Sequence, residues 1–139
     1  MAAERAKREL YRPEIHIGES DYDLIAAFAL RIERSDPELS RTIFDEIDRA
    51  QIHADKDLPA HVVAIGSEVE FVDERNGEVR RMTLVLPGEA EVEAGRISVM
   101  SPMGVGLIGL SEGQSIDWPY PDGRPRTLRI GSVRGSRRG

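Results

Sequence analysis

ISVMSPMGVGLIGL, from Ile97 to Leu110, is the stretch that decides the fold. Its first residues, Ile97 to Met100, are apolar apart from one serine, which predicts a buried strand. Ser101 and Pro102 then predict a helix start, because serine caps free backbone amides and proline is tolerated at the first helical position. The segment that follows is apolar on nearly every side, so it must be buried. We therefore expect a short helix lying in the concave face of a sheet.

Three glycines fall within or just after this helix: Gly104, Gly106 and Gly109. Each glycine weakens an isolated helix by roughly 1 kcal/mol. Their presence predicts that another backbone segment crosses very close to them. They lack the lysine and the strand-to-helix context of a phosphate-binding loop, so they do not indicate a nucleotide site.

The composition limits the class of protein. The chain has 139 residues, a net charge of −6 and no cysteine. This length fits one domain, or one small domain with an appendage. The acidic balance argues against a general nucleic-acid binder, and the lack of cysteine excludes disulfide and thiolate chemistry. No apolar run approaches the ~20 residues of a membrane span, and the charged N-terminus lacks an apolar signal core, so we expect a cytoplasmic protein.

Two amphipathic helices are predicted before the deciding stretch. Ser20 begins the first, whose apolar residues recur at helical spacing up to about residue 34. Asp36 is predicted to cap the second, with Pro37 at its first position. Helices separated by so few residues form an antiparallel hairpin, which would be about 20–25 Å long at 1.5 Å per residue.

Strand patterns follow the helices. The segments 68–73 and 79–86 flank Asn76-Gly77, which predicts a β-hairpin, and further strands are expected at 115–119 and 127–133. The segment 89–95 is expected to be an acidic surface loop. This pattern predicts an N-terminal arm and helical hairpin at 1–55, a sheet domain at 56–135 and a flexible tail at 136–139.

The quoted stretch, followed by GQSIDW at 113–118, resembles the C-terminal domain of the GreA/GreB transcript-cleavage factors. The likeness extends to residues 48–51, 62–63 and 77–80, and is closer to the branch of regulators of nucleoside diphosphate kinase (Rnk). The resemblance implies an α+β fold: a short N-terminal antiparallel helical hairpin followed by an FKBP-like C-terminal domain, in which an antiparallel sheet wraps one short helix.

The resemblance also implies a partner. In this family the C-terminal domain docks beside the secondary channel of RNA polymerase, and the hairpin enters the channel. The implied docking residues are Met100, Ser101, Pro102, Met103 and Gly104. We expect a monomer without cofactor or membrane contact, and only an indirect link to nucleoside diphosphate kinase, through transcription.

Transcript cleavage is the alternative function. Gre factors place two acidic side chains at the hairpin tip to help hold a second Mg²⁺, and hard oxygen ligands suit that ion. Here the tip offers Glu33, Asp36 and Glu38, but Asp36 and Glu38 also suit helix capping and the helix dipole. The Gre tip pattern is not reproduced around Pro37 and the hairpin is short. We therefore predict a competitor of Gre factors that is not an enzyme, with Asp36 and Glu38 as candidate ligands only if it is a cleavage factor.

A prolyl isomerase is a third hypothesis, suggested by fold alone. Fold does not imply function, and the predicted sheet domain has only Phe71, Trp118 and Tyr120 to build an aromatic pocket. Trp118 and Tyr120 are expected to cover one end of the sheet, with a partner anchor as the alternative.

The chain has three histidines, at His16, His53 and His61. His16 has no second ligand at metal-binding spacing and is interpreted as a solvent-facing strand residue. For His53 and His61, a metal site with the loop aspartates is the alternative to the favoured interpretation as loop surface, and no metal site is predicted.

Overall fold

The computed structural model describes residues 13–119 and 125–135. The helices are α2 (Glu19–Arg31), α3 (Pro37–Asp48) and α4 (Pro102–Leu107), with short 3₁₀ turns η1 (Asp55–Asp57), η2 (Pro87–Glu89) and η3 (Val92–Ala94). The strands are β1 (His16–Gly18), β2 (Gln51–His53), β3 (Glu68–Asp73), β4 (Glu78–Val85), β5 (Arg96–Ser98), β6 (Ser115–Pro119) and β7 (Pro125–Arg134). The predicted N-terminal arm, the tail at 136–139, the side chain of Trp118 and residue Tyr120 lie outside this description.

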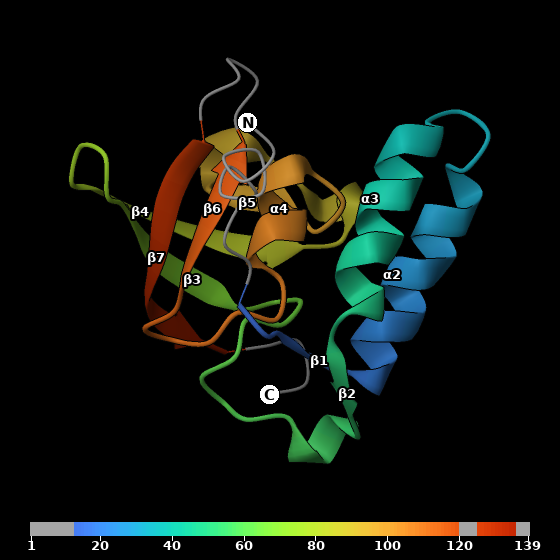
Figure 1. Cartoon of the computed structure of the whole chain (residues 1–139), viewed down its shortest axis with the longest axis horizontal. Helices are drawn as coiled ribbons and strands as arrows, with labels where there is room; N and C mark the ends of the chain where they lie inside the picture. Colours follow the sequence, from blue (N-terminus) through green and yellow to red (C-terminus); the bar gives the residue numbers. More distant parts are fainter. Residues whose placement is uncertain (1–12, 120–124, 136–139) are drawn as a thin grey trace, which may run out of the picture.

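The helices α2 and α3 lie side by side and run in opposite directions on one side of the molecule (Figure 1). Asp36 caps α3 by accepting a 3.1 Å hydrogen bond from the backbone N–H of Leu39, and Pro37 is its first residue. The predicted start of α2 at Ser20 is wrong, because the cap is Gly18 and the helix begins at Glu19. Ser20 instead donates hydrogen bonds from its backbone and its hydroxyl to Asp55.

The larger sheet has the strand order β5-β4-β3-β7-β6. Its pairs are antiparallel except at one edge, where β5 pairs with β4 in parallel. The prediction of an antiparallel sheet is therefore wrong, and the sheet is mixed. A parallel pair needs a crossover connection, and residues 86–95 with their two 3₁₀ turns provide it.

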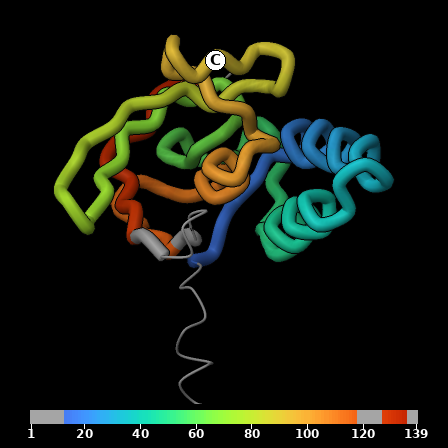
Figure 2. The backbone as a smooth tube through the Cα atoms, turned by 90° about the horizontal axis from the view of Figure 1, so that it is seen from above, coloured from blue at the N-terminus to red at the C-terminus, as the bar shows by residue number. Residues whose placement is uncertain are grey.

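The short helix α4 lies between the sheet and α3 (Figures 1 and 2). A Cβ atom on Gly104 would lie 2.0 Å from the backbone oxygen of Ser98, and one on Gly109 would lie 2.8 Å from the Cβ atom of Ile15. Gly109 also has a φ of +83°, which disfavours any other residue. The predicted close approach of other backbone segments is confirmed at these two glycines.

One apolar core joins the helix pair to the sheet. Ile25 of α2 and Ile43 of α3 belong to the same buried cluster as Phe71 of β3 and Leu107 of α4. The helices are therefore packed onto the sheet domain through their own apolar faces. Within the described residues, no helix is both long and apolar enough to cross a membrane.

Candidate functional site

The docking residues expected from the family resemblance, at positions 100–104, lie at the start of α4. Met100 is 8% exposed and belongs to the core. Ser101 caps the helix, because its hydroxyl accepts a 3.1 Å hydrogen bond from the N–H of Gly104 and donates a 2.7 Å bond to the backbone oxygen of Ser98. Met100 therefore has a structural role in the core, and the Ser101 hydroxyl has one as the helix cap.

Of the five docking residues expected from the sequence, at positions 100–104, only three are at least partly exposed. Pro102 is exposed, Ser101 and Met103 are half-buried, and Gly104 is buried. Met103 also packs against the core. We call Ser101, Pro102 and Met103 the α4 start, since they are the part of the proposed docking stretch that a partner can reach.

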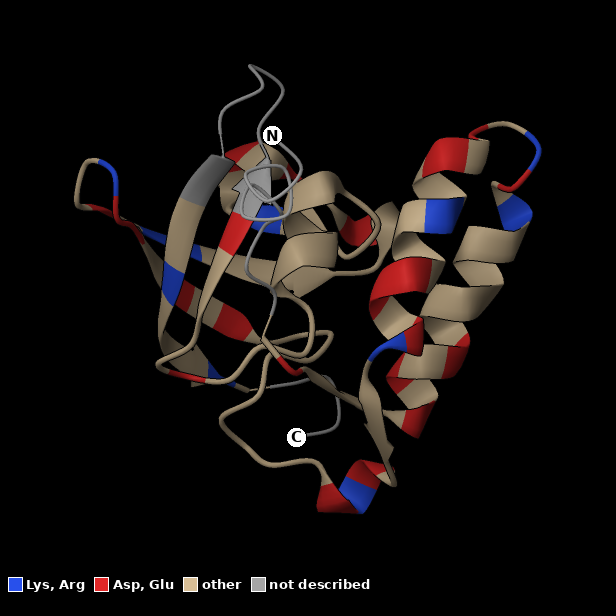
Figure 3. Ribbon diagram, viewed as in Figure 1, with Lys and Arg blue, Asp and Glu red and all other residues tan. Residues whose placement is uncertain are grey.

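The tip of the helix pair is acidic and exposed. Glu33, Asp36 and Glu38 are all solvent-exposed there, and basic residues lie beside them (Figure 3). Asp36 uses one carboxylate oxygen to cap α3. The described residues contain no group of three or more histidine, aspartate or glutamate side chains that could hold a metal ion. The tip thus has exposed carboxylates, but in the described residues they are not grouped as a metal-binding site.

An exposed apolar residue near the tip was not singled out from the sequence. Leu30, in the last turn of α2, is 60% exposed. Beside it, the guanidinium of Arg31 lies over the ring of Phe28, 5.1 Å from the ring centre. In the sequence, Leu30 is one position beyond Ala29, which lies on the buried face of α2. This offset from the helical spacing of the apolar residues is what indicates that Leu30 is exposed.

The base of the helix pair is held by the N-terminal strap, which we define as residues 13–18. Its strand β1 pairs in parallel with β2, so the strap lies beside the segment that leaves α3. On its other side, the N–H of His16 donates a 3.0 Å hydrogen bond to the backbone oxygen of Gly109. The strap therefore connects the base of the helix pair to the end of α4.

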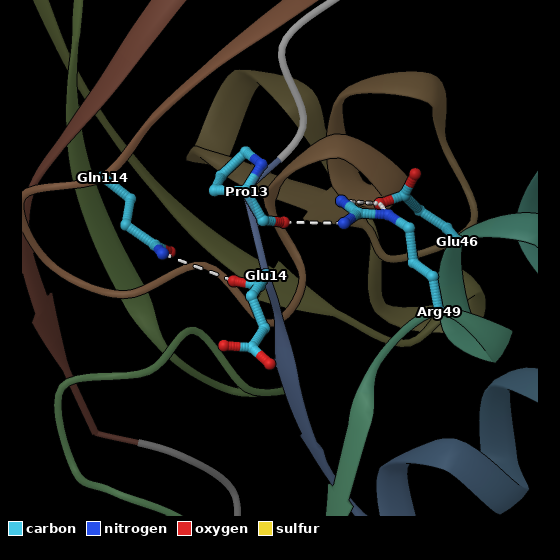
Figure 4. A network of polar contacts seen from close by, with 5 residues as sticks. All are labelled: Pro13, Glu14, Glu46, Arg49 and Gln114. Atoms are coloured by element: carbon cyan, nitrogen blue, oxygen red, sulfur yellow. Dashed lines mark hydrogen bonds and ion pairs between the residues drawn. The ribbon is translucent and has the colours of Figure 1, made fainter.

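A buried ion pair fixes the start of the strap (Figure 4). Glu46 is 1% exposed, and the guanidinium of Arg49 donates to its carboxylate at 2.7 and 3.0 Å. The same guanidinium donates a 2.6 Å hydrogen bond to the backbone oxygen of Pro13. One residue later, the Gln114 side chain donates to the oxygen of Glu14 at 3.3 Å. Contacts from α3 and from the loop after α4 thus meet on the strap.

The first turn of α2 is tied to the rest of the chain as well. The buried carboxylate of Asp21 accepts a 3.0 Å hydrogen bond from the N–H of Ile65, just before the sheet. The hydroxyl of Tyr22 donates a 2.8 Å bond to Asp48 of α3, and this bond, together with burial, raises the pKa of Tyr22 above its ordinary value of 10. The orientation of the helix pair is therefore fixed by polar contacts in addition to the core.

The structure brings together two histidines that the sequence analysis treats as separate surface residues. Nδ1 of His16 lies 2.9 Å from Nε2 of His53, and both side chains are half-buried. His61 is exposed. The contact between His16 and His53 was not predicted, because the two residues are 37 positions apart and the β1–β2 pairing is not evident from either short segment.

The side chain of Phe71, one of the three aromatic residues considered for an isomerase pocket, is 0% exposed and therefore cannot line an open site. An open pocket in the described part of the chain is lined by Val85, Glu89 and Arg96, with no aromatic residue. Phe71 is thus a core residue, while the side chain of Trp118 and residue Tyr120 lie outside the described part of the chain.

Comparisons with known proteins give a consistent result. The family model described as "Transcription elongation factor, GreA/GreB, C-term" matches residues 58–134. The "Regulator of nucleoside diphosphate kinase" of Escherichia coli (strain K12) is 35% identical over 119 residues, which are 86% of this chain and 88% of that protein. "Transcription elongation factor GreA" of Azorhizobium caulinodans is 38% identical over 90 residues, 65% of this chain and 57% of that protein.

A solved structure, "Prokaryotic transcription elongation factor GreA/GreB from Nitrosomonas europaea", superposes with a TM-score of 0.70 at 28% identity. The match covers 89% of this chain and 100% of that one. The likeness therefore extends beyond residues 58–134, which the family model matches.

Proposed function

Since the chain belongs to the GreA/GreB family of transcription elongation factors, we propose that it regulates elongation by binding RNA polymerase at the entrance of the secondary channel, without stimulating transcript cleavage. In this proposal, the FKBP-like domain at 56–135 docks and the helix pair within 1–55 points into the channel. The protein then acts as a competitor of Gre factors and is not itself an enzyme.

The observation that carries the proposal is that the helix pair is short and that Asp36, at its tip, already caps α3. The helices α2 and α3 have 13 and 12 residues, so each spans about 20 Å at 1.5 Å per residue. Asp36 accepts the N–H of Leu39, which is the ordinary role of a capping aspartate. A carboxylate that stops short of the reacting phosphate cannot coordinate its metal ion, so such a tip occupies the channel without catalysis.

The α4 start is the proposed docking surface. Its exposed Pro102 and half-buried Met103 give an apolar patch next to a helix start, and methionine adapts easily to a partner surface. The name of the Escherichia coli relative refers to nucleoside diphosphate kinase. We propose that any such effect of this chain is indirect, through transcription.

Binding is tested by co-sedimentation of the purified protein with core RNA polymerase, and by displacement of GreA from the polymerase. Pro102→Glu should weaken binding, because it places a charge on the apolar patch while glutamate remains favourable in the first turn of a helix. Val79→Glu is the matched control, since Val79 is 58% exposed on β4, away from α4. If the wild-type protein neither co-sediments with core RNA polymerase nor displaces GreA from it, the proposed function is wrong.

The cleavage alternative is favoured by one observation, the exposed acidic cluster of Glu33, Asp36 and Glu38 at the tip. It is tested with backtracked elongation complexes, which the wild-type protein should leave uncut. Robust cleavage that disappears in the double variant Asp36→Ala/Glu38→Ala would replace our proposal with a Gre-type cleavage function.

A further inference from the structure

We propose that His16 and His53 form a two-histidine site for a divalent transition-metal ion of the nickel and copper class. The site lies at the base of the helix pair, away from the tip and from the α4 start. This inference does not depend on the proposed function.

The distance between the two nitrogen atoms carries the argument. Nδ1 of His16 and Nε2 of His53 face each other at 2.9 Å, with ring centres 5.0 Å apart. Imidazole nitrogen binds such metals at about 2.0–2.1 Å, so one ion placed between these atoms would have an N–metal–N angle of about 90°. A right angle is typical of the tetragonal geometry of Ni²⁺ and Cu²⁺, whereas tetrahedral Zn²⁺ needs a wider angle.

The two ligands come from backbone that is held in place before any ion binds. His16 begins β1 and His53 ends β2, and these strands pair in parallel, with His16 opposite Gln51 and Gly18 opposite His53. The backbone N–H of His16 is bonded to Gly109, and the N–H of Gln51 is bonded to Ile15 at 2.9 Å. Ligands on paired strands keep their separation, which favours chelation by both over binding by either alone.

The metal would replace a proton that the pair already shares. In the metal-free protein, one of the two facing nitrogens carries the hydrogen of the imidazole–imidazole bond. When the ion binds, that proton moves to the other nitrogen of its own ring, and both rings turn so that their lone pairs, which lie along the N–N line in the hydrogen bond, point to the metal. Neither ring needs to lose or gain net charge, and the remaining coordination positions are left to water.

The site has two protein ligands, because the described residues contain no cluster of three or more potential ligands. Binding should therefore be reversible and easily abolished by a chelator. Since β1 precedes α2 and β2 follows α3, a bound ion would join the two chain segments that enter and leave the helix pair.

The test is calorimetric titration of the untagged full-length chain with Ni²⁺ alone. We expect one equivalent to bind the wild-type protein, and His16→Gln and His53→Gln each to weaken binding at least about tenfold. His61→Gln is the matched control, because His61 is the third histidine and is exposed. Mg²⁺, which prefers oxygen ligands, should not bind at the same concentrations.

A second measurement needs no variant. Ni²⁺ is paramagnetic, so substoichiometric ion should broaden the backbone amide signals around His16 and His53 and leave those around His61 sharp. Ni²⁺ should also raise the melting temperature, because only the folded chain presents both ligands. Absence of saturable binding, equal binding by all three variants, or broadening centred on His61 would overturn the proposal.

Discussion

Asp21 and Ile65 are 44 positions apart in the sequence and are joined by a 3.0 Å hydrogen bond from the backbone N–H of Ile65 to the Asp21 carboxylate. Asp21 lies in the first turn of α2 and is 1% exposed, and Ile65 lies just before β3. The helix pair is therefore attached to the sheet domain by a buried, charge-assisted bond in addition to apolar contacts.

Asp21→Ala should lower the free energy of unfolding by about 1.5–3 kcal/mol, because it leaves the buried N–H of Ile65 without this acceptor. The measurement is urea unfolding followed by circular dichroism. Asp23→Ala, an exposed position on the same helix, is the control and should change stability little. Equal effects of the two variants would show that the bond is not important.

Arg49→Ala should lower the free energy of unfolding by about 2–4 kcal/mol, because it removes the guanidinium that pairs with buried Glu46 and binds Pro13. The side chain of Arg49 is 27% exposed, so water can compensate part of the loss. Arg41→Ala, on the exposed face of α3, is the control. Hydrogen exchange should also show faster exchange of the β1–β2 amides in the Arg49 variant and not in the control.

Gly104→Ala should be strongly destabilising, because the added Cβ atom would lie 2.0 Å from the backbone oxygen of Ser98. Overpacking against backbone costs about 1–3 kcal/mol or more. Gly88→Ala is a matched control, since a Cβ atom there meets nothing within 4 Å. A thermal melt of each variant compares the two, and a Gly104 variant as stable as wild type would contradict the packing described here.

Asp36→Ala should cost about 1 kcal/mol through loss of the α3 cap, whereas Asp36→Asn should be nearly neutral because asparagine caps equally well. Neither variant should change transcript cleavage in the presence of polymerase. If Asp36→Asn kept full stability but abolished a cleavage activity, the carboxylate charge itself would be functional.

Tyr22 should titrate at a higher pH than an ordinary tyrosine, because its bond to Asp48 and its burial raise its pKa. A pKa raised in the folded state contributes stability that is fully present below the unfolded value of about 10 and is lost as the pH rises through the folded value. Tyr22→Phe should therefore weaken the dependence of stability on pH above 10. Absorbance titration of tyrosinate and unfolding at pH 8 and 11 provide the test.

The parts of the fold that local signals specify follow from the sequence. The strand β3 has the predicted bounds, and Gly77 in the following turn has a φ of +75° that glycine adopts easily. The cap at Asp36 and the buried, glycine-containing helix α4 are also predictable, because each depends on a few neighbouring residues.

The remaining features depend on residues that are distant in the sequence. The strands β1 and β5 have three residues each, too few to show a periodicity, so neither the β1–β2 pairing nor the parallel β4–β5 pairing could be predicted. The contacts of Arg49 with Pro13 and of His16 with His53 follow from these pairings. For the docking stretch, the sequence identifies the turn and is compatible with a core role for Met100, but it does not specify that Pro102 is exposed while Ser101 and Met103 are half-buried.

The parallel pairing of β1 with β2 places the entry and exit of the helix pair next to each other. Extra helical turns added symmetrically at the tip would leave this junction and the shared core unchanged. The reach of the helix pair from the sheet domain can thus vary by whole turns, about 5.4 Å at a time, while the rest of the fold stays the same.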